Sequence, residues 1–311
     1  MTVDVVIPAY RPGNKFQKLL AMLQVQEAPV NKIIVINTEE KYWRPEDYKD
    51  YGNLEVHHIS KSQFDHGASR NMGIGFSESE IVVCMTDDAI PADKRLISSL
   101  IKGFSEKGPQ GESVVEVYGR QLAGKDCSEA ERYTRSFNYP AQSKIKTIKD
   151  LDEMGIKTFF ASNVCCAYKR ENFKRLGGFI NRTIFNEDMI FASKVLKAGY
   201  AIAYAAEAKV IHSHSYTPVQ QFHRNFDLGV SQADHPEVFQ GISSEGEGIR
   251  LIRQTTRYLM RKKRFQEIPG MIISSGFKYM GFQLGRHYRS LPKGIVKKMS
   301  MNQSYWDREE R

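Results

Sequence analysis

The fold is decided by residues 3–36, which read VDVVIPAYRPGNKFQKLLAMLQVQEAPVNKIIVI. Two short runs rich in β-branched residues, 3–7 and 33–36, lie at its two ends. Between them, large apolar residues repeat at the spacing of one face of an α-helix, at Phe16, Leu19, Leu20 and Leu23. The stretch therefore predicts a strand, a helix and a second strand, the unit from which parallel sheets are built.

The same alternation continues downstream. Further strands are predicted at residues 54–59, 80–85, 113–122, 159–168 and 200–211, and helices at 68–77, 97–104, 127–138, 147–154, 171–176 and 187–198. Polar or glycine-bearing breaks separate these segments. The pattern predicts an α/β fold with a mostly parallel sheet that helices cover on both faces.

After residue 214 the pattern changes, because no clear strand follows. Residues 219–228, 248–264 and 268–288 are predicted as helices, interrupted by Pro236, Pro269 and Pro292. We therefore expect two regions: residues 1–215 as the α/β domain, and residues 216–311 as a helical C-terminal region.

The composition suits a folded cytosolic protein. A chain of 311 residues with 41% hydrophobic content can bury a large core. A strand follows Met1 in place of a signal peptide, and the apolar stretch at residues 268–277 is shorter than the ~20 residues that span a bilayer. The cysteines, Cys84, Cys127, Cys165 and Cys166, lack CxxC spacing, which favours reduced thiols over disulfides or a zinc site.

The positive charge is concentrated near the end of the chain. The net charge is +9, and residues 216–311 contain 16 Lys and Arg against 9 Asp and Glu. Residues 250–298 contain thirteen basic residues and a single acid, Glu267. Such a segment is expected to bind an anionic partner: acidic lipid headgroups, a pyrophosphate-bearing substrate or nucleic acid.

Two acidic pairs are the first candidates for chemistry. Asp87 and Asp88 follow the predicted strand 80–85, and Glu187 and Asp188 open a helix about a hundred residues downstream. Carboxylates in one crevice suit a divalent metal and a general base. Acids at a strand end or in the first turn of a helix are also common as caps, so the residues alone leave both interpretations open. GxGxxG and GxxxxGK[ST] phosphate-binding motifs are absent.

Four ordered motifs carry a family resemblance: VIPAY at residues 6–10, HGASRNMGI at 66–74, TDDA at 86–89 and NED at 186–188. Together they resemble glycosyltransferase family 2. Residues 64–74, HSHSYT at 212–217 and QFHRNFD at 221–227 more narrowly resemble the bacterial rhamnosyltransferases of that family. The resemblance implies a Rossmann-like GT-A fold, an inverting mechanism, a divalent cation (Mg²⁺ or Mn²⁺) and a dTDP-rhamnose donor.

The resemblance also assigns roles to both acidic pairs. It implies that Asp88 holds the cation against the donor diphosphate, while Asp87 touches the ribose or the metal. Asp188 is implied as the base that takes a proton from the acceptor hydroxyl, and Glu187 as a residue that orients that hydroxyl or a neighbouring donor.

Two histidines are candidate metal ligands. His212 and His214 alternate at a strand end, so both side chains are expected on the same face. A histidine there is otherwise a surface or hydrogen-bonded residue. The resemblance favours a metal ligand, with His212 ahead of His214.

The donor site is expected at the carboxyl ends of the strands. Arg70 follows Gly67 at the start of a helix, where a guanidinium and free backbone amides suit donor phosphates. Many family members carry an aspartate where this chain has Asn37, so dTDP and UDP both stay open as the nucleotide. The full expected set is Pro8, Tyr10, Arg11, Asn37, Thr38, Glu39, His66, Gly67, Arg70 and Asp87.

The acceptor site is expected to involve Arg224, Asn225 and Asp227, and His66 is a candidate for the same role. Each is alternatively a cap or a satisfied buried group. The resemblance implies a bacterial surface polysaccharide as acceptor, linked to a polyprenyl diphosphate. Bases interleaved with apolar residues in the C-terminal region fit a helix at the inner face of the cytoplasmic membrane, or alternatively one that packs on the main domain.

Two rival functions follow from the same residues. One is the same fold with a UDP-hexose or UDP-N-acetylhexosamine donor. The other is a basic RNA-binding protein, which the absence of any RNP or KH signature disfavours, so no nucleic-acid partner is expected.

Overall fold

The computed structural model describes residues 1–214, 216–242 and 245–307. The chain forms two compact units. Unit 1 consists of Met1–Leu122, Tyr139–Arg182 and Glu187–His212, and unit 2 of Ala123–Asn138, Thr183–Asn186 and Ser213–Arg311. The expected division into residues 1–215 and 216–311 stays a prediction, and its boundary residue Ser215 lies outside the described residues.

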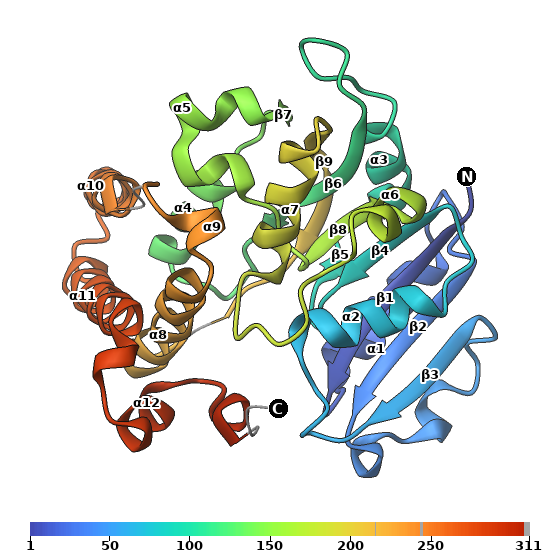
Figure 1. Cartoon of the computed structure of the whole chain (residues 1–311), viewed down its shortest axis with the longest axis horizontal. Helices are drawn as coiled ribbons and strands as arrows, with labels where there is room; N and C mark the ends of the chain where they lie inside the picture. The colour runs from blue at the N-terminus through green and yellow to red at the C-terminus, as the bar shows by residue number, and fades with distance from the viewer. Residues whose placement is uncertain (215, 243–244, 308–311) are drawn as a thin grey trace. The chain divides into compact units, whose positions relative to one another are not determined.

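The first half of unit 1 is a parallel sheet in the order β3, β2, β1, β4 (Figure 1). Its elements are β1 (Val3–Tyr10), α1 (Asn14–Gln24), β2 (Lys32–Thr38), β3 (Leu54–Ile59), α2 (His66–Gly75) and β4 (Ile81–Met85). Val5 and Ile7 of β1 join the core cluster that contains the apolar face of α1. On the other face of β1, a Cβ added at Gly73 of α2 would lie 2.4 Å from Val6 Cγ1. Helices therefore cover both faces, as the sequence predicts.

The second half of unit 1 mixes strand directions. The strands are β5 (Ile90–Pro91), β6 (Val114–Leu122), β7 (Lys144–Lys146), β8 (Cys165–Lys169) and β9 (Ala201–Ile211), and the helices are α3 (Leu96–Gly103), α5 (Leu151–Met154), α6 (Arg170–Arg175) and α7 (Glu187–Lys197). Strand β8 runs antiparallel to both β4 and β6, while β9 runs parallel to β6. The α/β class is confirmed, and the parallel pairing of β1 to β4 gives way to a mixed sheet from β8 onward.

The predicted strand at residues 159–168 is wrong in its first part. Strand β8 begins only at Cys165, and residues 160–164 form a loop. The backbone N–H of Asn163 donates to Asp188 Oδ2, 3.1 Å away, so a side chain takes the place of a neighbouring strand. This loop lies at the site described below.

Unit 2 is helical, which confirms the predicted character of the C-terminal part. Its helices are α4 (Glu129–Asn138), α8 (Pro218–Asp234), α9 (Pro236–Phe239), α10 (Glu245–Arg261), α11 (Glu267–Arg286) and α12 (Lys293–Met299). Helix α8 begins at a capping box formed by Thr217 and Gln220. Helices α8 and α11 approach closely (Figure 1), because a Cβ at Gly281 would lie 2.2 Å from the Phe222 carbonyl oxygen. Among the described helices, none has the length and apolarity needed to cross a bilayer.

Candidate active site

The first acidic pair follows β4 at the carboxyl end of the parallel sheet. Asp87 Oδ2 accepts a hydrogen bond from the backbone N–H of Tyr10 at the end of β1, 3.2 Å away. The backbone N–H of Thr86 donates to the Val164 carbonyl at 3.3 Å. Burial, and then the neighbouring Asp88 charge, raise the pKa of Asp87 to about 6. The pair is thus held beside the ends of the neighbouring parallel strands β1 and β4.

Asp88 and His212 lie together in unit 1. Asp88 Oδ1 is 3.4 Å from His212 Nε2, and Asp88 Oδ2 is 3.6 Å from the Lys15 ammonium. Gln121 Nε2 donates to the hydroxyls of Tyr139 and Ser162, which turns Gln121 Oε1 toward His212 Nδ1 at 3.0 Å. His212 Nδ1 therefore carries the proton in the neutral ring, and the Nε2 lone pair is left on the Asp88 side.

These groups fit a divalent cation. A carboxylate oxygen and an unprotonated imidazole nitrogen are hard and borderline ligands, a combination that suits Mn²⁺ better than Mg²⁺, which prefers oxygen alone. The Gln121 contact to the far ring nitrogen is the kind of support that metal-bound histidines have in proteins.

His214, the other predicted ligand, belongs to unit 2, where its ring stacks on that of Tyr216 with centroids 5.0 Å apart. Its metal-binding role stays a prediction. The intervening Ser215 of the HSHSYT motif lies outside the described residues.

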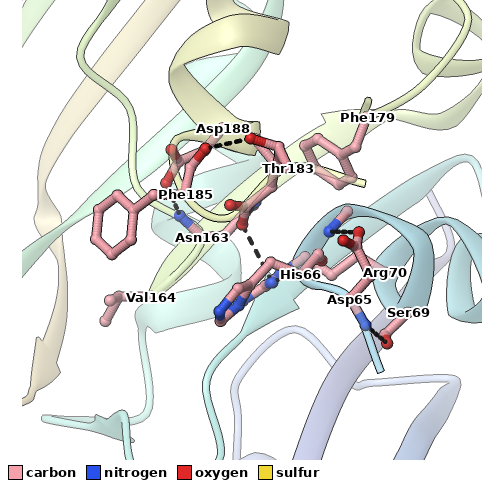
Figure 2. Close-up of polar contacts among 12 residues, drawn as sticks. Asp65, His66, Ser69, Arg70, Asn163, Val164, Phe179, Thr183, Phe185 and Asp188 are labelled. Atoms are coloured by element: carbon pink, nitrogen blue, oxygen red, sulfur yellow. Dashed lines mark hydrogen bonds and ion pairs between the residues drawn. The ribbon is translucent and has the colours of Figure 1, made fainter. Parts of the chain in front are cut away.

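The second acidic pair begins α7 and is tied to the 160–164 loop (Figure 2). Asp188 accepts two backbone hydrogen bonds, from Asn163 at 3.1 Å and from Met189 at 2.8 Å. The Asn163 side chain donates to Glu187 Oε1 at 3.1 Å and accepts from the Tyr168 hydroxyl at 2.8 Å. One residue of the loop therefore positions both carboxylates.

Arg70 neutralises Glu187. Its Nη1 lies 3.1 Å from Glu187 Oε1 and also donates to the His66 carbonyl at 2.9 Å. The Arg70 Nε is buried without a hydrogen-bond partner in the described part of the chain. The guanidinium that the sequence assigns to donor phosphates is thus engaged by Glu187, and its contact with a donor stays a prediction.

The pKa values of the two adjacent acids are shifted in opposite directions. Burial raises the pKa of Glu187, but Arg70, His66 and the Asn163 hydrogen bond together outweigh it and hold the pKa below its usual value. Burial, and then the Glu187 charge, raise the pKa of Asp188 to about 7. Two neighbouring carboxyls with separated pKa values are the arrangement that places one as a fixed charge and the other as a proton acceptor.

Residues 162–164 connect both acidic pairs, and the sequence analysis missed this. Ser162 contacts Gln121, which orients His212. Asn163 holds Asp188 and Glu187, and Val164 receives the Thr86 N–H. Polar Ser162 and Asn163 inside an otherwise apolar run were the available signal. Asp88 and Asp188 both belong to unit 1, and their membership of one active site stays a prediction.

The expected nucleoside site lies at the end of β2. Asn37 Nδ2 contacts the Glu39 carbonyl at 3.3 Å and His58 Nδ1 at 3.0 Å, so Oδ1 is the acceptor left over. Asn37 Oδ1 and Thr38 Oγ1 are both buried with no partner among the described residues. Because orphaned buried polar atoms are rare, this pair points to a ligand with a donor group.

Aromatic side chains flank that position. The Arg11 guanidinium lies over the ring of Tyr42 at 4.4 Å and that of Tyr10 at 5.1 Å, and it donates to the Tyr42 hydroxyl at 2.7 Å. Glu39 accepts from the Lys61 backbone N–H at 2.8 Å. Pro8 lies two residues before Tyr10 in β1.

Gly67 and His66 open α2. A Cβ at Gly67 would lie 2.0 Å from the Ile180 carbonyl oxygen. Close packing therefore explains this glycine, and no contact with the nucleotide-sugar is needed to account for it. The His66 ring meets that of Phe64 edge-on at 5.1 Å.

Three of the acceptor candidates, Arg224, Asn225 and Asp227, lie in unit 2 on α8, whereas His66 belongs to α2 in unit 1. The Arg224 guanidinium lies over the Phe185 ring at 4.7 Å, and Asn225 Nδ2 donates to the Gln221 carbonyl at 2.7 Å. Asp227 Oδ2 accepts from the backbone N–H groups of Met301 and Asn302, at 3.0 and 3.1 Å. These contacts are structural ones, and acceptor binding by the three residues stays a prediction.

Comparison with solved structures supports the fold. A mannosyltransferase from Pyrobaculum calidifontis, in complex with GDP-Man and Mn²⁺, matches with a TM-score of 0.56 at 14% identity, over 98% of this chain and 84% of that chain. Staphylococcus aureus TarS 1-349 in complex with UDP-GlcNAc matches with a TM-score of 0.50 at 14% identity, over 97% and 84% of the chains. The predicted GT-A fold class is confirmed at this level.

Sequence comparisons show the family. Residues 4–177 match the family model described as Glycosyl transferase family 2. The O-antigen chain rhamnosyltransferase RfbN of Salmonella typhimurium is 35% identical over 309 residues, covering 99% of this chain and 96% of the relative. WbaN of Salmonella anatum, also an O-antigen chain rhamnosyltransferase, is 36% identical over 97% and 95% of the chains. The predicted resemblance is confirmed: the chain belongs to glycosyl transferase family 2 and is a glycosyltransferase.

Proposed function

We propose that this enzyme transfers L-rhamnose from dTDP-rhamnose to a bacterial cell-surface polysaccharide under construction on a polyprenyl diphosphate carrier. Two relatives that match almost the whole chain are O-antigen chain rhamnosyltransferases. The observation that supports the proposed chemistry is the 162–164 loop, whose residues contact Gln121 beside His212, the Thr86 N–H next to Asp87, and Asp188.

Asp188 is the proposed base. Two backbone N–H groups fix its carboxylate, and a pKa of about 7 lets it accept a proton near neutral pH. The acceptor oxygen forms a bond to the anomeric carbon while the bond from that carbon to the diphosphate oxygen breaks, and the hydroxyl proton passes to Asp188. Attack from the face opposite the diphosphate inverts the configuration.

Asp88 and His212, with His214 as a further candidate, are the proposed ligands of Mn²⁺ or Mg²⁺. The cation, when bound, acts as a Lewis acid on the developing charge of the leaving nucleotide diphosphate. Gln121 keeps the His212 ring in the tautomer that this requires, and Asp87 is held beside Asp88 by the Tyr10 N–H.

The proposed pyrimidine site uses Asn37 and Thr38. Asn37 Oδ1 is an acceptor without a hydrogen-bond donor in the described structure, and the imide N–H of thymine or uracil is a group that can donate to it. A neutral amide in place of the aspartate of many family members still supplies this acceptor. Glu39 follows the end of β2, and Arg11, which packs on the rings of Tyr10 and Tyr42, follows the end of β1. These residues are further candidates for contacts with the sugar or the base.

The proposed place of action is the inner face of the cytoplasmic membrane, where a polyprenyl-linked acceptor is held. The basic excess of residues 216–311 favours contact with an anionic surface.

A transfer assay tests the function. Purified enzyme with dTDP-rhamnose and a lipid-linked glycan acceptor is expected to release dTDP, and EDTA is expected to abolish the release until Mn²⁺ is added back. Asp188→Asn should fold normally and lose turnover by at least about a hundredfold, the range of general-base contributions. Asp50→Asn, an exposed acid of unit 1, is the matched control and should keep its rate.

A donor panel separates the sugar nucleotides. Higher kcat/KM with UDP-glucose or UDP-N-acetylglucosamine than with dTDP-rhamnose would reassign the donor while leaving the site intact. Full activity in EDTA would remove the metal from the proposal.

A further inference from the structure

Helix α11 exposes a stripe without charge. Its exposed positions between residues 268 and 285 are Pro269, Gly270, Ile272, Ile273, Gly276, Tyr279 and Met280, which recur every three to four residues along one face. Ile272, Ile273 and Tyr279 are 53%, 54% and 57% exposed. The opposite face packs on α8 through Gly281 and Gly285. A surface helix normally turns charged residues to water, so this outer face is apolar where polar residues are expected.

Basic residues border the stripe at its N-terminal end. Arg261 ends α10, and the connection to α11 continues with Lys262, Lys263 and Arg264. All four are exposed, and the following Phe265 is 57% exposed. Further basic residues share the exposed face of α10 at three- to four-residue spacing, at Arg250, Arg253 and Arg257. Phe265 is only four residues before Pro269, so the basic segment leads directly into the apolar stripe along the chain.

We propose that residues 261–265 and the exposed stripe of α11, together called the docking face, bind the headgroup region of a bilayer that contains anionic phospholipid. Aliphatic and aromatic side chains would insert at the boundary with the acyl chains, and the arginines and lysines would pair with lipid phosphates. The inference deepens the membrane location in the proposed function and rests on it.

The chemistry favours a membrane over nucleic acid. An RNA backbone would pair with the basic residues, but it offers nothing to the exposed side chains of Ile272, Ile273 and Met280. A lipid surface satisfies both halves of the docking face. Charge attraction near a membrane is screened by salt, while the apolar contribution is not, so the two halves are experimentally separable.

Co-sedimentation with vesicles tests the proposal. The full chain, without donor or acceptor, is mixed with vesicles of phosphatidylcholine alone or of phosphatidylcholine with about a third phosphatidylglycerol, a composition that gives a negative surface potential. Binding is expected to the anionic vesicles, to fall at least about tenfold in high salt, and to be weak on phosphatidylcholine.

Two variants separate the contributions. Ile272→Ser with Ile273→Ser should weaken partitioning at least about tenfold by removing apolar insertion. Neutralising residues 261–264 to glutamine should weaken it at least about a hundredfold and reduce the salt dependence. The matched control neutralises four exposed lysines of unit 1, Lys18, Lys49, Lys102 and Lys174, and should bind more strongly than the 261–264 variant.

Several outcomes would overturn the proposal. Equal binding by the Ile272/Ile273 variant and the parent would remove the stripe from the contact. A concentration-dependent dimer that the same variant dissociates, without vesicle binding, would assign the stripe to a second copy of the chain. Displacement from vesicles by an RNA oligonucleotide that binds more tightly would assign the basic residues to nucleic acid. Lipid binding is measured without sugar transfer, so failure of the transfer assay would not change the conclusion drawn from vesicle binding.

Discussion

Arg70 and Glu187 form an ion pair inside unit 1, with Nη1 and Oε1 3.1 Å apart and side chains only 5% and 9% exposed. Removing two charges from water is costly, and a buried pair repays that cost only with good geometry and further hydrogen bonds. Asn163 supplies such a bond to the same Glu187 oxygen. The pair places a positive charge near the proposed base, since Arg70 also acts to lower the pKa of Asp188.

Breaking this pair should destabilise unit 1. Arg70→Met leaves a buried carboxylate without its cation and is expected to lower the free energy of unfolding by about 3–5 kcal/mol. The double variant Arg70→Met with Glu187→Gln should recover part of that loss. Urea unfolding followed by Trp43 fluorescence in a Trp306→Phe background measures it. The control Arg95→Met breaks an exposed pair with Asp93 and should cost at most about 1 kcal/mol. An equal loss of unfolding free energy in Arg70→Met and Arg95→Met would contradict the conclusion that the Arg70–Glu187 pair stabilises unit 1.

The rate should depend on the ionisation of Asp188. Because a base must be unprotonated, kcat/KM is expected to rise as pH climbs toward about 7 and then level off. Glu187→Gln removes the negative charge that raises the pKa of Asp188, so the rising limb should move to lower pH. Initial rates from about pH 5.5 to about pH 8.5 at subsaturating donor measure both profiles. A shift to higher pH in the variant would show that another group controls the limb.

Local patterns predicted the parts of this molecule that depend on local spacing. The 3–36 stretch predicts β1, α1 and β2 because Phe16, Leu19 and Leu20 repeat with the helix period between two apolar runs. The candidate acids were found because the carboxyl ends of strands and the first turns of helices are readable from sequence.

The supporting residues were missed because their contacts join distant parts of the chain. Gln121 meets His212 across 91 residues, and Asn163 meets Asp188 across 25. Neither has a motif of its own. An apolar run such as residues 159–168 likewise gives no sign that its first part leaves the sheet to hold a side chain, since periodicity reports burial and not the partner of each N–H.

Gln121 should matter to the cation through His212. Gln121→Leu removes the acceptor for the Nδ1 proton and lets the ring adopt the tautomer with Nε2 protonated. Mn²⁺ affinity is therefore expected to fall about 10- to 100-fold, the usual effect of losing such a contact. Titration of free Mn²⁺ by electron paramagnetic resonance measures it without turnover.

Gln121→Glu keeps an acceptor at the same place and should retain affinity. An unchanged dissociation constant in the leucine variant would instead mean that His212 contributes nothing to the cation site.

The crossing of α8 and α11 makes a matched pair of glycine substitutions informative. A Cβ at Gly281 would lie 2.2 Å from the Phe222 carbonyl oxygen, a backbone atom that cannot move aside without shifting α8. At Gly276, five residues earlier in the same helix, a Cβ would meet nothing within 4 Å. Gly281→Ala should therefore lower the stability of unit 2 by about 1–3 kcal/mol, the range for overpacked sites. Gly276→Ala should raise it by up to about 1 kcal/mol, because alanine is the better helix former.

Trp306 lies in unit 2, with its ring 5.5 Å from that of Tyr288, so its fluorescence in a Trp43→Phe background reports this unit during urea unfolding. The two alanine variants have the same added methyl group and the same gain in helix propensity. Their difference in unfolding free energy therefore isolates the helix contact, and a difference near zero would mean that the two helices do not approach as closely as the glycines require.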